Sequence, residues 1–458
     1  MKKIGRYNIQ GLLGKGGMGK VYKVDLPPIG KIGALKLLDP DPLLTQVMGY
    51  EHLHRLFIQE AVTLAAIRHP NVIQIHDFDM VHGRPFYVMD FFANNLGTLM
   101  GESYQLERPG RVLSIDKAID YADQTLSGLC GLHDAGILHR DIKPFNLLLS
   151  DRDTVKICDF GLSKLRGETF AGPANLKVGS PYYAAPEQEE NPDSADVRSD
   201  LYPVGVMLYR MLTGRLPDTV IQHNGCAPPS RLNPDLDEYW DAFMVQAIAR
   251  RPEQRFPDAA AMRSALTELE LHWQGQKEKR CSIAWPRDEN QRSEVLSAHR
   301  PPRQTPVKCR PSEAARRFHL DPLWRPKHYS VNRFTHPEDS CIADQSSGLA
   351  WQQSGSAYPR TWRQAHAYID RLNEQQFAGH TNWRLPTIDE LITLLKPQPH
   401  GQDLCIAPVF DATQRWIWST DRRSFVAAYY VDMELGFVGW QDFSAPFYVR
   451  AVRTVHPK

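Results

Sequence analysis

Four polar residues near the middle of the chain have types that suit the transfer of a phosphoryl group. Two short apolar runs separated by turn-forming residues lie between Asn146 and Asp159, which predicts a β-hairpin. Strand pairing would bring the Asn146 amide oxygen beside the Asp159 carboxylate, and such hard oxygens bind Mg²⁺ together with phosphates. Asp141 precedes this hairpin and can accept a hydroxyl proton, while Lys143 can steady a transferring phosphoryl group.

A glycine-rich stretch, residues 14–19, is a second candidate site. Its G-x-G-x-x-G spacing also opens dinucleotide-binding folds, but a helix must follow there. Here Val21, Tyr22, Val24 and Leu26 continue as a strand. The stretch is therefore predicted to be the tip of a hairpin whose backbone amides lie over phosphates.

Glu60 is a third candidate because it interrupts an apolar stripe. Leu53, Phe57, Glu60 and Leu64 fall at helical spacing within a helix predicted over residues 51–68. An inward carboxylate is costly unless it is paired, so Glu60 is expected to have a cationic partner.

The string from His139 to Asn146, H-R-D-x-K-x-x-N, followed by Asp159-Phe160-Gly161, resembles the loops of bacterial eukaryotic-like Ser/Thr protein kinases. The resemblance covers residues 7–271 and implies an α+β, two-lobed protein kinase fold, with an N-lobe over 1–92 and a C-lobe over 93–272. It implies that Asp141 and Lys143 are catalytic and that Asn146 and Asp159 hold Mg²⁺, or Mn²⁺. ATP would be the donor and protein hydroxyls the acceptors, with autophosphorylation as one outcome.

The same resemblance implies how ATP is held. Lys36, in the predicted strand 33–38, would pair with Glu60 and contact the α- and β-phosphates. Met89 would be the gatekeeper, and the backbone from Asp90 to Phe92 would bond the adenine. The implied ATP-binding residues are Leu13, Gly14, Lys15, Gly16, Gly17, Met18, Gly19, Val21, Ala34, Lys36, Met89, Asp90, Phe91 and Phe92.

Residues 162–178 are polar and irregular, and the Gly179 to Glu187 string that follows resembles the end of a kinase activation segment. The resemblance implies that Ser180 bonds the catalytic Asp and Lys. Arg140 would be a regulatory pocket for a phosphate on Thr169 or Ser163. The alternative is that these hydroxyls merely keep a loop soluble.

Two buried supports are also implied by the resemblance. Arg255 would pair with Glu187, and Asp200 would hold the backbone of the His-Arg-Asp turn. Pro203 follows in a helix predicted to run from Asp200 through Leu212, where a first-turn proline is tolerated. A helix capped by Ser114 should deliver the chain to His139, with His133 as a packing or surface residue.

The overall composition is that of an ordinary globular protein, with 42% apolar and 23% charged residues among 458. This length predicts two or three domains, and the formal charge of +1 argues against global attraction to nucleic acid or membrane. The seven cysteines are dispersed, and no window reaches the roughly 18 apolar residues of a membrane span. These features predict a cytoplasmic protein with reduced thiols, although Cys341 and Cys405 could meet.

Residues 277–327 carry 13 Lys plus Arg against 6 Asp plus Glu, with seven prolines. Few apolar residues and no periodicity predict an extended, partly disordered basic linker, placed at 273–329. The alternative is a tether that touches nucleic acid or an acidic partner.

Six of the ten tryptophans lie between residues 351 and 440. Capping boxes at Thr361 and Thr387 predict two helices among several strand-like runs, which indicates a compact α+β domain over 330–458. The string Asn382-Trp383-Arg384-Leu385-Pro386 and its neighbours resemble the Lcl-type C-terminal domain, implying a C-type-lectin-like fold over 334–455. Tryptophans are expected in the core, and the domain is expected to recognise an unknown ligand or protein partner.

Three functions remain at this point. The leading hypothesis is a Ser/Thr protein kinase with a recognition or sensing domain. The second is a catalytically silent nucleotide-binding switch or scaffold that works through its last domain. The third, a small-molecule phosphotransferase of kinase-like fold, is disfavoured by Arg140, Lys143 and the A-P-E segment.

Overall fold

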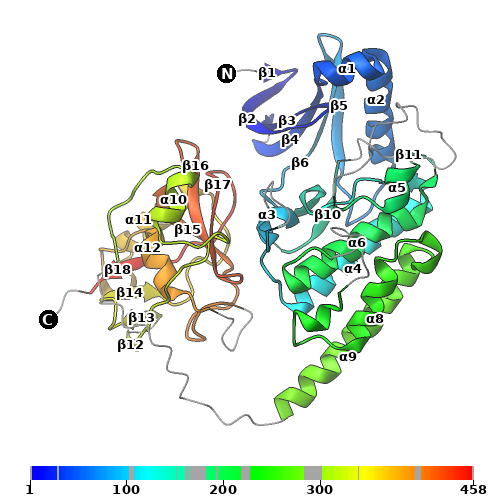
Figure 1. Ribbon diagram of the computed structural model, residues 1–458. Coiled ribbons are helices and arrows are strands. Elements are labelled where there is room, and N and C mark those ends of the chain that lie inside the picture. Colours follow the sequence, from blue (N-terminus) through cyan, green and yellow to red (C-terminus); the bar gives the residue numbers. More distant parts are fainter. Residues whose placement is uncertain are drawn as a thin grey trace. The chain divides into compact units, whose positions relative to one another are not determined.

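A computed structural model shows the chain as two compact units, Met1–Ala284 and Trp285–Lys458 (Figure 1). The structure describes residues 3–27, 30–102, 108–150, 152–159, 164–165, 182–191, 194–217, 227–282, 302–338, 340–397 and 404–455.

The first lobe of unit 1 is built on an antiparallel sheet of order β1-β2-β3-β4-β6-β5 (Figure 1). Its inner face is closed by Tyr7, Val24, Leu35, Phe86 and Val88, all buried. The strands are β1 (Lys3–Ile4), β2 (Tyr7–Lys15), β3 (Gly19–Leu26), β4 (Lys31–Leu38), β5 (Ile75–Val81) and β6 (Arg84–Asp90).

Two helices, α1 (Pro42–Met48) and α2 (Tyr50–Ala66), accompany this sheet. Leu53, Phe57 and Leu64 of α2 are buried as their helical spacing predicted, and Glu60 is buried on the same stripe. Because α2 packs against β5 and β6, Glu60 faces the sheet that carries Lys36.

The second lobe is mainly helical and centres on α4 (Ile115–Asp134) and α6 (Val197–Thr213). Gly128 allows α4 to lie close to strand β10 (Val155–Ile157), since a Cβ there would come within 2.6 Å of Ile157 Cδ1. The other elements are β7 (Asn94–Asn95), α3 (Leu96–Met100), β8 (Ile137–Leu138), η1 (Pro144–Asn146), β9 (Leu147–Leu149), β10 (Val155–Ile157), β11 (Lys164–Leu165), α5 (Pro186–Glu190), η3 (Pro229–Arg231), α8 (Glu238–Ala247), η4 (Pro252–Gln254) and α9 (Ala259–Ser282).

Pro203 lies in the interior of α6 and not in its first turn, because the helix begins at Val197 behind an Asp196 cap. The helix nevertheless continues through Pro203 to Thr213, so the expected helix is adjusted and not broken. Every residue from Ser199 to Leu212 is buried, so tertiary packing supports the helix on all sides.

Unit 2 contains two antiparallel sheets, of order β12-β13-β14-β18 and β15-β16-β17. Trp351, Trp383, Trp416 and Trp418 are buried, as expected of core residues, whereas Trp362 and Trp440 are only half-buried. The elements are α10 (Pro311–Arg317), β12 (Phe334–Glu338), β13 (Cys341–Asp344), β14 (Leu349–Gln352), α11 (Trp362–Glu374), η5 (Phe377–Gly379), α12 (Ile388–Leu391), η6 (Ile392–Leu394), β15 (Trp416–Arg422), β16 (Ala427–Asp432), β17 (Phe437–Asp442) and β18 (Val452–Thr454).

The structure corrects the expected linker at both ends. Helix α9 continues through Ser282, and residues 302–329 belong to unit 2. Ala314, Phe318 and Leu320 are buried in the unit 2 core, since even a basic stretch can bury a few apolar side chains against a ready surface. The Arg303 guanidinium lies 2.7 Å from the buried Asp421 carboxylate, which fixes the start of this segment.

Two further expectations concern the cysteines and the membrane. Cys405 has a free thiol whose Sγ donates to the Glu434 carbonyl at 3.0 Å, so the possible bond between Cys341 and Cys405 is absent.

Among the helices of the described ranges, none is both long and apolar enough to cross a membrane.

Candidate active site

The glycine-rich stretch forms the hairpin tip between β2 and β3, as predicted. The Gly16 amide donates to the Gly19 carbonyl at 2.9 Å, and the Asp41 amide donates to the Gly17 carbonyl at 2.9 Å. A Cβ on Gly19 would meet the Leu37 carbonyl oxygen at 2.2 Å, so a larger residue would displace β4. From Leu13 to Val21 the predicted ATP-binding residues therefore form one glycine-lined ribbon.

Lys36 on β4 joins the two lobes of unit 1. Its Nζ lies 2.7 Å from Glu60 Oε1 and 3.0 Å from Asp159 Oδ1. Burial alone would lower the pKa of the Lys36 ammonium, but the charges of Asp159 and Glu60 outweigh it and hold that pKa well above its usual value. The charge of Lys36 in turn lowers the pKa of Asp159 to about 2.

Glu60 has a second partner that the sequence did not indicate. The Tyr87 hydroxyl donates to Glu60 Oε1 at 2.9 Å, and Tyr87 is buried on β6 beside β4. This bond and the ammonium of Lys36 share one carboxylate oxygen, which fixes the carboxylate in place.

The predicted hinge follows the end of β6. Ala34 pairs with Met89 and Gly33 with Asp90 across the sheet, and Met89 is buried. The Asp90 carboxylate is occupied by Lys31 at 2.8 Å and His76 at 2.9 Å. The Lys23 ammonium lies 5.2 Å from the Phe91 ring centre, and Phe92 is half-buried, so backbone groups remain the contacts that the hinge offers a ligand.

The catalytic loop holds Asp141 by its neighbours. Asp141 Oδ2 lies 2.6 Å from Lys143 Nζ and 3.1 Å from Asn146 Nδ2. The same amide nitrogen also donates to the Asp141 carbonyl at 2.8 Å. These contacts fix the orientation of the carboxylate and turn the Asn146 side chain so that its oxygen is the atom left to bind a metal.

The predicted hairpin β9–β10 brings Asn146 next to the residue before Asp159. Ile157 pairs with Leu147, and the Cys158 amide donates to the Asn146 carbonyl at 2.9 Å. Asp159 has a φ of +64° and a half-exposed side chain. Its carboxylate and the Asn146 amide oxygen are hard donors that fit Mg²⁺ or Mn²⁺.

This donor set is small. Within the described ranges, no three His, Cys, Asp or Glu side chains form a metal-binding group. A cation here would therefore complete its shell with water and phosphate oxygens, which is how Mg²⁺ is usually held beside nucleotides.

Asp200 supports the catalytic loop from α6. The His139 amide donates to Asp200 Oδ2 at 2.9 Å and the Arg140 amide to Oδ1 at 2.7 Å. His133 Nε2 lies 2.9 Å from the same Oδ2, although the sequence suggested only a packing or surface role for His133. A histidine near a helix end carries no local signal of a partner 67 residues away.

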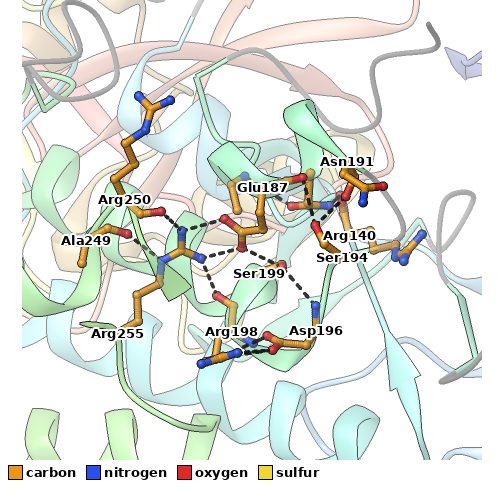
Figure 2. Close-up of polar contacts among 12 residues, drawn as sticks. Arg140, Glu187, Asn191, Ser194, Asp196, Arg198, Ser199, Ala249, Arg250 and Arg255 are labelled. Carbon is orange, nitrogen blue, oxygen red and sulfur yellow. Dashed lines mark hydrogen bonds and ion pairs between the residues drawn. The ribbon is translucent and has the colours of Figure 1, made fainter. Parts of the chain in front are cut away.

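Figure 2 shows the bidentate ion pair between the buried Arg255 and the largely buried Glu187, whose N–O distances are 2.7 and 2.8 Å. Arg255 also donates to the carbonyls of Ala249, Arg250 and Arg198, and Ser199 donates to Glu187 at 2.7 Å. The expected pair thus anchors the A-P-E turn to α6.

The regulatory residues can be placed only in part. Arg140 is buried and has a φ of +66°, and its carbonyl accepts from Gln188 at 3.1 Å. Thr169, Ser163 and Ser180 lie outside the described residues, so their predicted partners stay predictions.

A buried cluster that the sequence did not indicate lies close to the A-P-E turn. Glu102 and Arg210 are 3.4 Å apart with side chains 1% exposed, and the Tyr183 hydroxyl donates to Glu102. Burial raises the pKa of Glu102, with Arg210 opposing it. The cluster ties the end of α3 to α6 and to the segment before the A-P-E turn.

Comparisons with known families match both parts of the chain. Residues 7–261 match the protein kinase domain family, and residues 340–453 match the Lcl C-terminal domain family.

Individual proteins are similar to the first part. Serine/threonine-protein kinase pkn3 of Myxococcus xanthus is 32% identical over 313 residues, 64% of this chain and 54% of that protein. Serine/threonine-protein kinase PksC of Streptomyces coelicolor is 33% identical over 288 residues, 59% and 50% of the two chains. The solved PknI kinase domain of Mycobacterium tuberculosis is 24% identical, covers 58% of this chain and 97% of that one, and has a TM-score of 0.44. The chain spans about half the length of these curated relatives.

Proposed function

The chain belongs to the protein kinase family, and from this premise we propose that it is a Ser/Thr protein kinase that transfers the γ-phosphoryl group of ATP to protein hydroxyls. The observation that carries the proposal is the double contact of Lys36 with Glu60 and Asp159. Phosphoryl transfer in this family needs the lysine, its helix glutamate and the metal-binding aspartate in place together. A silent nucleotide-binding switch could use the same contacts to hold ATP, but it would have no need of Asp141 and Lys143 held 2.6 Å apart.

Bound ATP and Mg²⁺ would supply the phosphoryl group and neutralise the charge on its oxygens. Lys36 orients the phosphates from β4, and the glycine ribbon covers them with backbone amides. Asn146 and Asp159 would hold the cation, with Mn²⁺ as a substitute.

Asp141 receives the acceptor hydroxyl and takes its proton. Lys143, at 2.6 Å from the Asp141 carboxylate, is near enough to balance the negative charge of the transferring group. Protein acceptors, including a second copy of the chain, follow from the family.

The test is transfer of labelled γ-phosphate to a generic protein acceptor, by the full chain and by Asp141→Asn. We expect transfer that needs Mg²⁺ and that falls by roughly 10²- to 10⁴-fold in the variant. Asp116→Asn removes an exposed carboxylate of the same lobe and should leave transfer unchanged. Absence of transfer, or equal transfer by Asp141→Asn, would reject the proposal.

We infer that unit 2 selects a partner or senses a ligand. It is compact by itself, and its described part offers no cluster of His, Cys, Asp or Glu that could bind a metal. A chain that ends at Ser282 should keep transfer to the generic acceptor and lose partner choice. Unchanged transfer to every acceptor would contradict the recognition role.

A further inference from the structure

A cavity of about 420 Å³ opens on unit 2 within the segment that had been expected to be a linker. This volume is in the usual range for sites that bind a small ligand or one side chain. Its lining residues are Lys308, Cys309, Glu313, Arg316, Arg317 and His319.

The cavity is electropositive. Three cations, Lys308, Arg316 and Arg317, face one carboxylate, Glu313, which leaves a formal +2 with His319 neutral. The three cations are exposed, and across the described parts of the chain no carboxylate forms an ion pair with them. The helix dipole places about half a negative charge at the C-terminal end of α10, which is smaller than the formal charge of +2 on the cavity lining.

The walls of the cavity are held by the core of unit 2. The backbone of Lys308 forms a parallel β-bridge with Arg422, and the Cys309 amide donates to the Arg422 carbonyl at 3.1 Å. The Tyr429 hydroxyl donates to the Cys309 carbonyl at 2.8 Å. The backbone at Lys308 and Cys309 is therefore fixed by the core of unit 2, which lowers part of the entropy cost of binding.

His319 occupies an unusual backbone conformation at the cavity. Its φ is +54°, directly after the cap of α10, where Gly is the usual residue. The Lys327 amide donates to the His319 carbonyl at 3.0 Å and helps to hold it there. An imidazole at this position adds a hydrogen-bonding group that Gly would lack.

An aromatic ring borders the cation site. Lys308 Nζ lies 3.8 Å from the centre of the Phe425 ring, which is 78% exposed. A ligand that carries a compact anion next to an apolar group would match this site, because the anion could contact Lys308 and the apolar group could contact the Phe425 ring.

We propose that this cavity binds a phosphorylated serine or threonine on a polypeptide. Such a phosphate carries about −1.5 to −2 charge and accepts several hydrogen bonds, which suits two guanidinium groups and an ammonium. The inference rests on the proposed kinase activity for the origin of the ligand, since unit 1 would create this group. Three cations line this one cavity, as a single phosphate requires, whereas a nucleic acid strand is contacted at many successive phosphates.

The test is fluorescence anisotropy with the full chain, without ATP, and a labelled neutral peptide that contains one phosphoserine. We expect it to bind at least about tenfold more tightly than its serine counterpart, and less tightly as salt increases. The double variant Arg316→Gln/Arg317→Gln should lose the preference for phosphate. Arg363→Gln/Arg371→Gln removes two exposed arginines of α11 and should keep it.

Equal affinity for the two peptides, or an unchanged preference in Arg316→Gln/Arg317→Gln, would overturn the proposal. Tighter binding of a single-stranded oligonucleotide or of phosphatidylserine vesicles, with displacement of the peptide, would overturn it as well. Lys308→Gln serves as a second variant if circular dichroism shows that the double variant is unfolded. A chain that transfers phosphate but ignores peptide phosphorylation contradicts the cavity proposal alone, while a chain that binds without transferring contradicts the kinase proposal alone.

Discussion

His133 Nε2 lies 2.9 Å from Asp200 Oδ2 and thereby joins α4 to α6 behind the catalytic loop. The two oxygens of Asp200 also accept the backbone amides of His139 and Arg140. Burial alone would raise the pKa of the Asp200 carboxyl, but its hydrogen bonds to His133 and Arg140 outweigh this and lower it. One fully buried carboxylate therefore positions the turn that leads to Asp141.

We predict that Asp200→Asn lowers both stability and transfer. The NH2 group of the new Asn side chain would face the backbone N–H groups of His139 and Arg140, which are donors themselves. Breaking a buried charged network typically costs roughly 3 to 5 kcal/mol. Displacement of the turn should reduce transfer by about 100-fold. Urea unfolding and the labelled-phosphate assay measure the two effects.

The same variant has a pH signature. Because the folded pKa of Asp200 is lowered from 3.8, its contribution to stability is present above that pH and is lost as the pH falls below it. The gap in unfolding free energy between wild type and Asp200→Asn should therefore shrink below about pH 3.8. A gap that stays constant into this acid range would contradict the assigned network.

Lys36→Met should remove the link between the lobes of unit 1. The variant leaves Glu60, whose side chain is 2% exposed, without its cationic partner, and should cost roughly 3 to 5 kcal/mol. Adding Glu60→Gln should restore part of that stability without restoring transfer, because the phosphates would still lack their cation. Equal stability of the single and double variants in urea would show that the pair is not coupled.

Arg255→Lys should fail to replace arginine. Arg255 forms a bidentate ion pair with Glu187 and also donates to three backbone carbonyls. A single ammonium group cannot reproduce this geometry. We expect a loss of at least about 2 kcal/mol. Arg250→Gln is the control, because the Arg250–Glu190 pair is 60% and 66% exposed and should contribute less than about 1 kcal/mol. Equal unfolding curves for the two variants would disprove the anchoring role.

Asn146→Leu should raise the Mg²⁺ concentration needed for transfer. The substitution removes the amide oxygen that we propose as a metal ligand, and it removes the Nδ2 donor that orients Asp141. Titration with Mg²⁺ at saturating ATP measures this, and we expect a shift of about 10- to 100-fold. A half-saturating Mg²⁺ concentration equal to that of wild type would exclude Asn146 as a ligand.

Residues 302–329 should be necessary for unit 2 to fold. We expect the fragment 302–458 to unfold cooperatively and the fragment 330–458 to lack a cooperative transition. The shorter fragment exposes the surface that covers Phe318 and leaves the buried Asp421 without Arg303. Calorimetry of both fragments measures whether each has a cooperative unfolding transition. Two similar transitions would show that residues 302–329 are a linker and not part of the folded unit.

The sequence by itself determined most of the candidate site, for local physical reasons. Turn residues between two apolar runs predicted the β9–β10 hairpin, and a strand after the glycines predicted the β2–β3 hairpin. The position of Glu60 on an apolar stripe predicted a cationic partner, and the kinase resemblance identified Lys36 as that partner. Each of these inferences needs only the periodicity of one segment or one known motif.

The tertiary structure decided what depends on surfaces distant in the chain. His133 meets Asp200, Glu102 meets Arg210 and Tyr183, and the basic segment 302–329 folds onto the core of unit 2. In that segment a few apolar residues stand among many charges, so composition indicated solvent exposure. Their burial is favourable because unit 2 presents a complementary apolar surface and a buried Asp421 carboxylate that pairs with Arg303, neither of which any local pattern records.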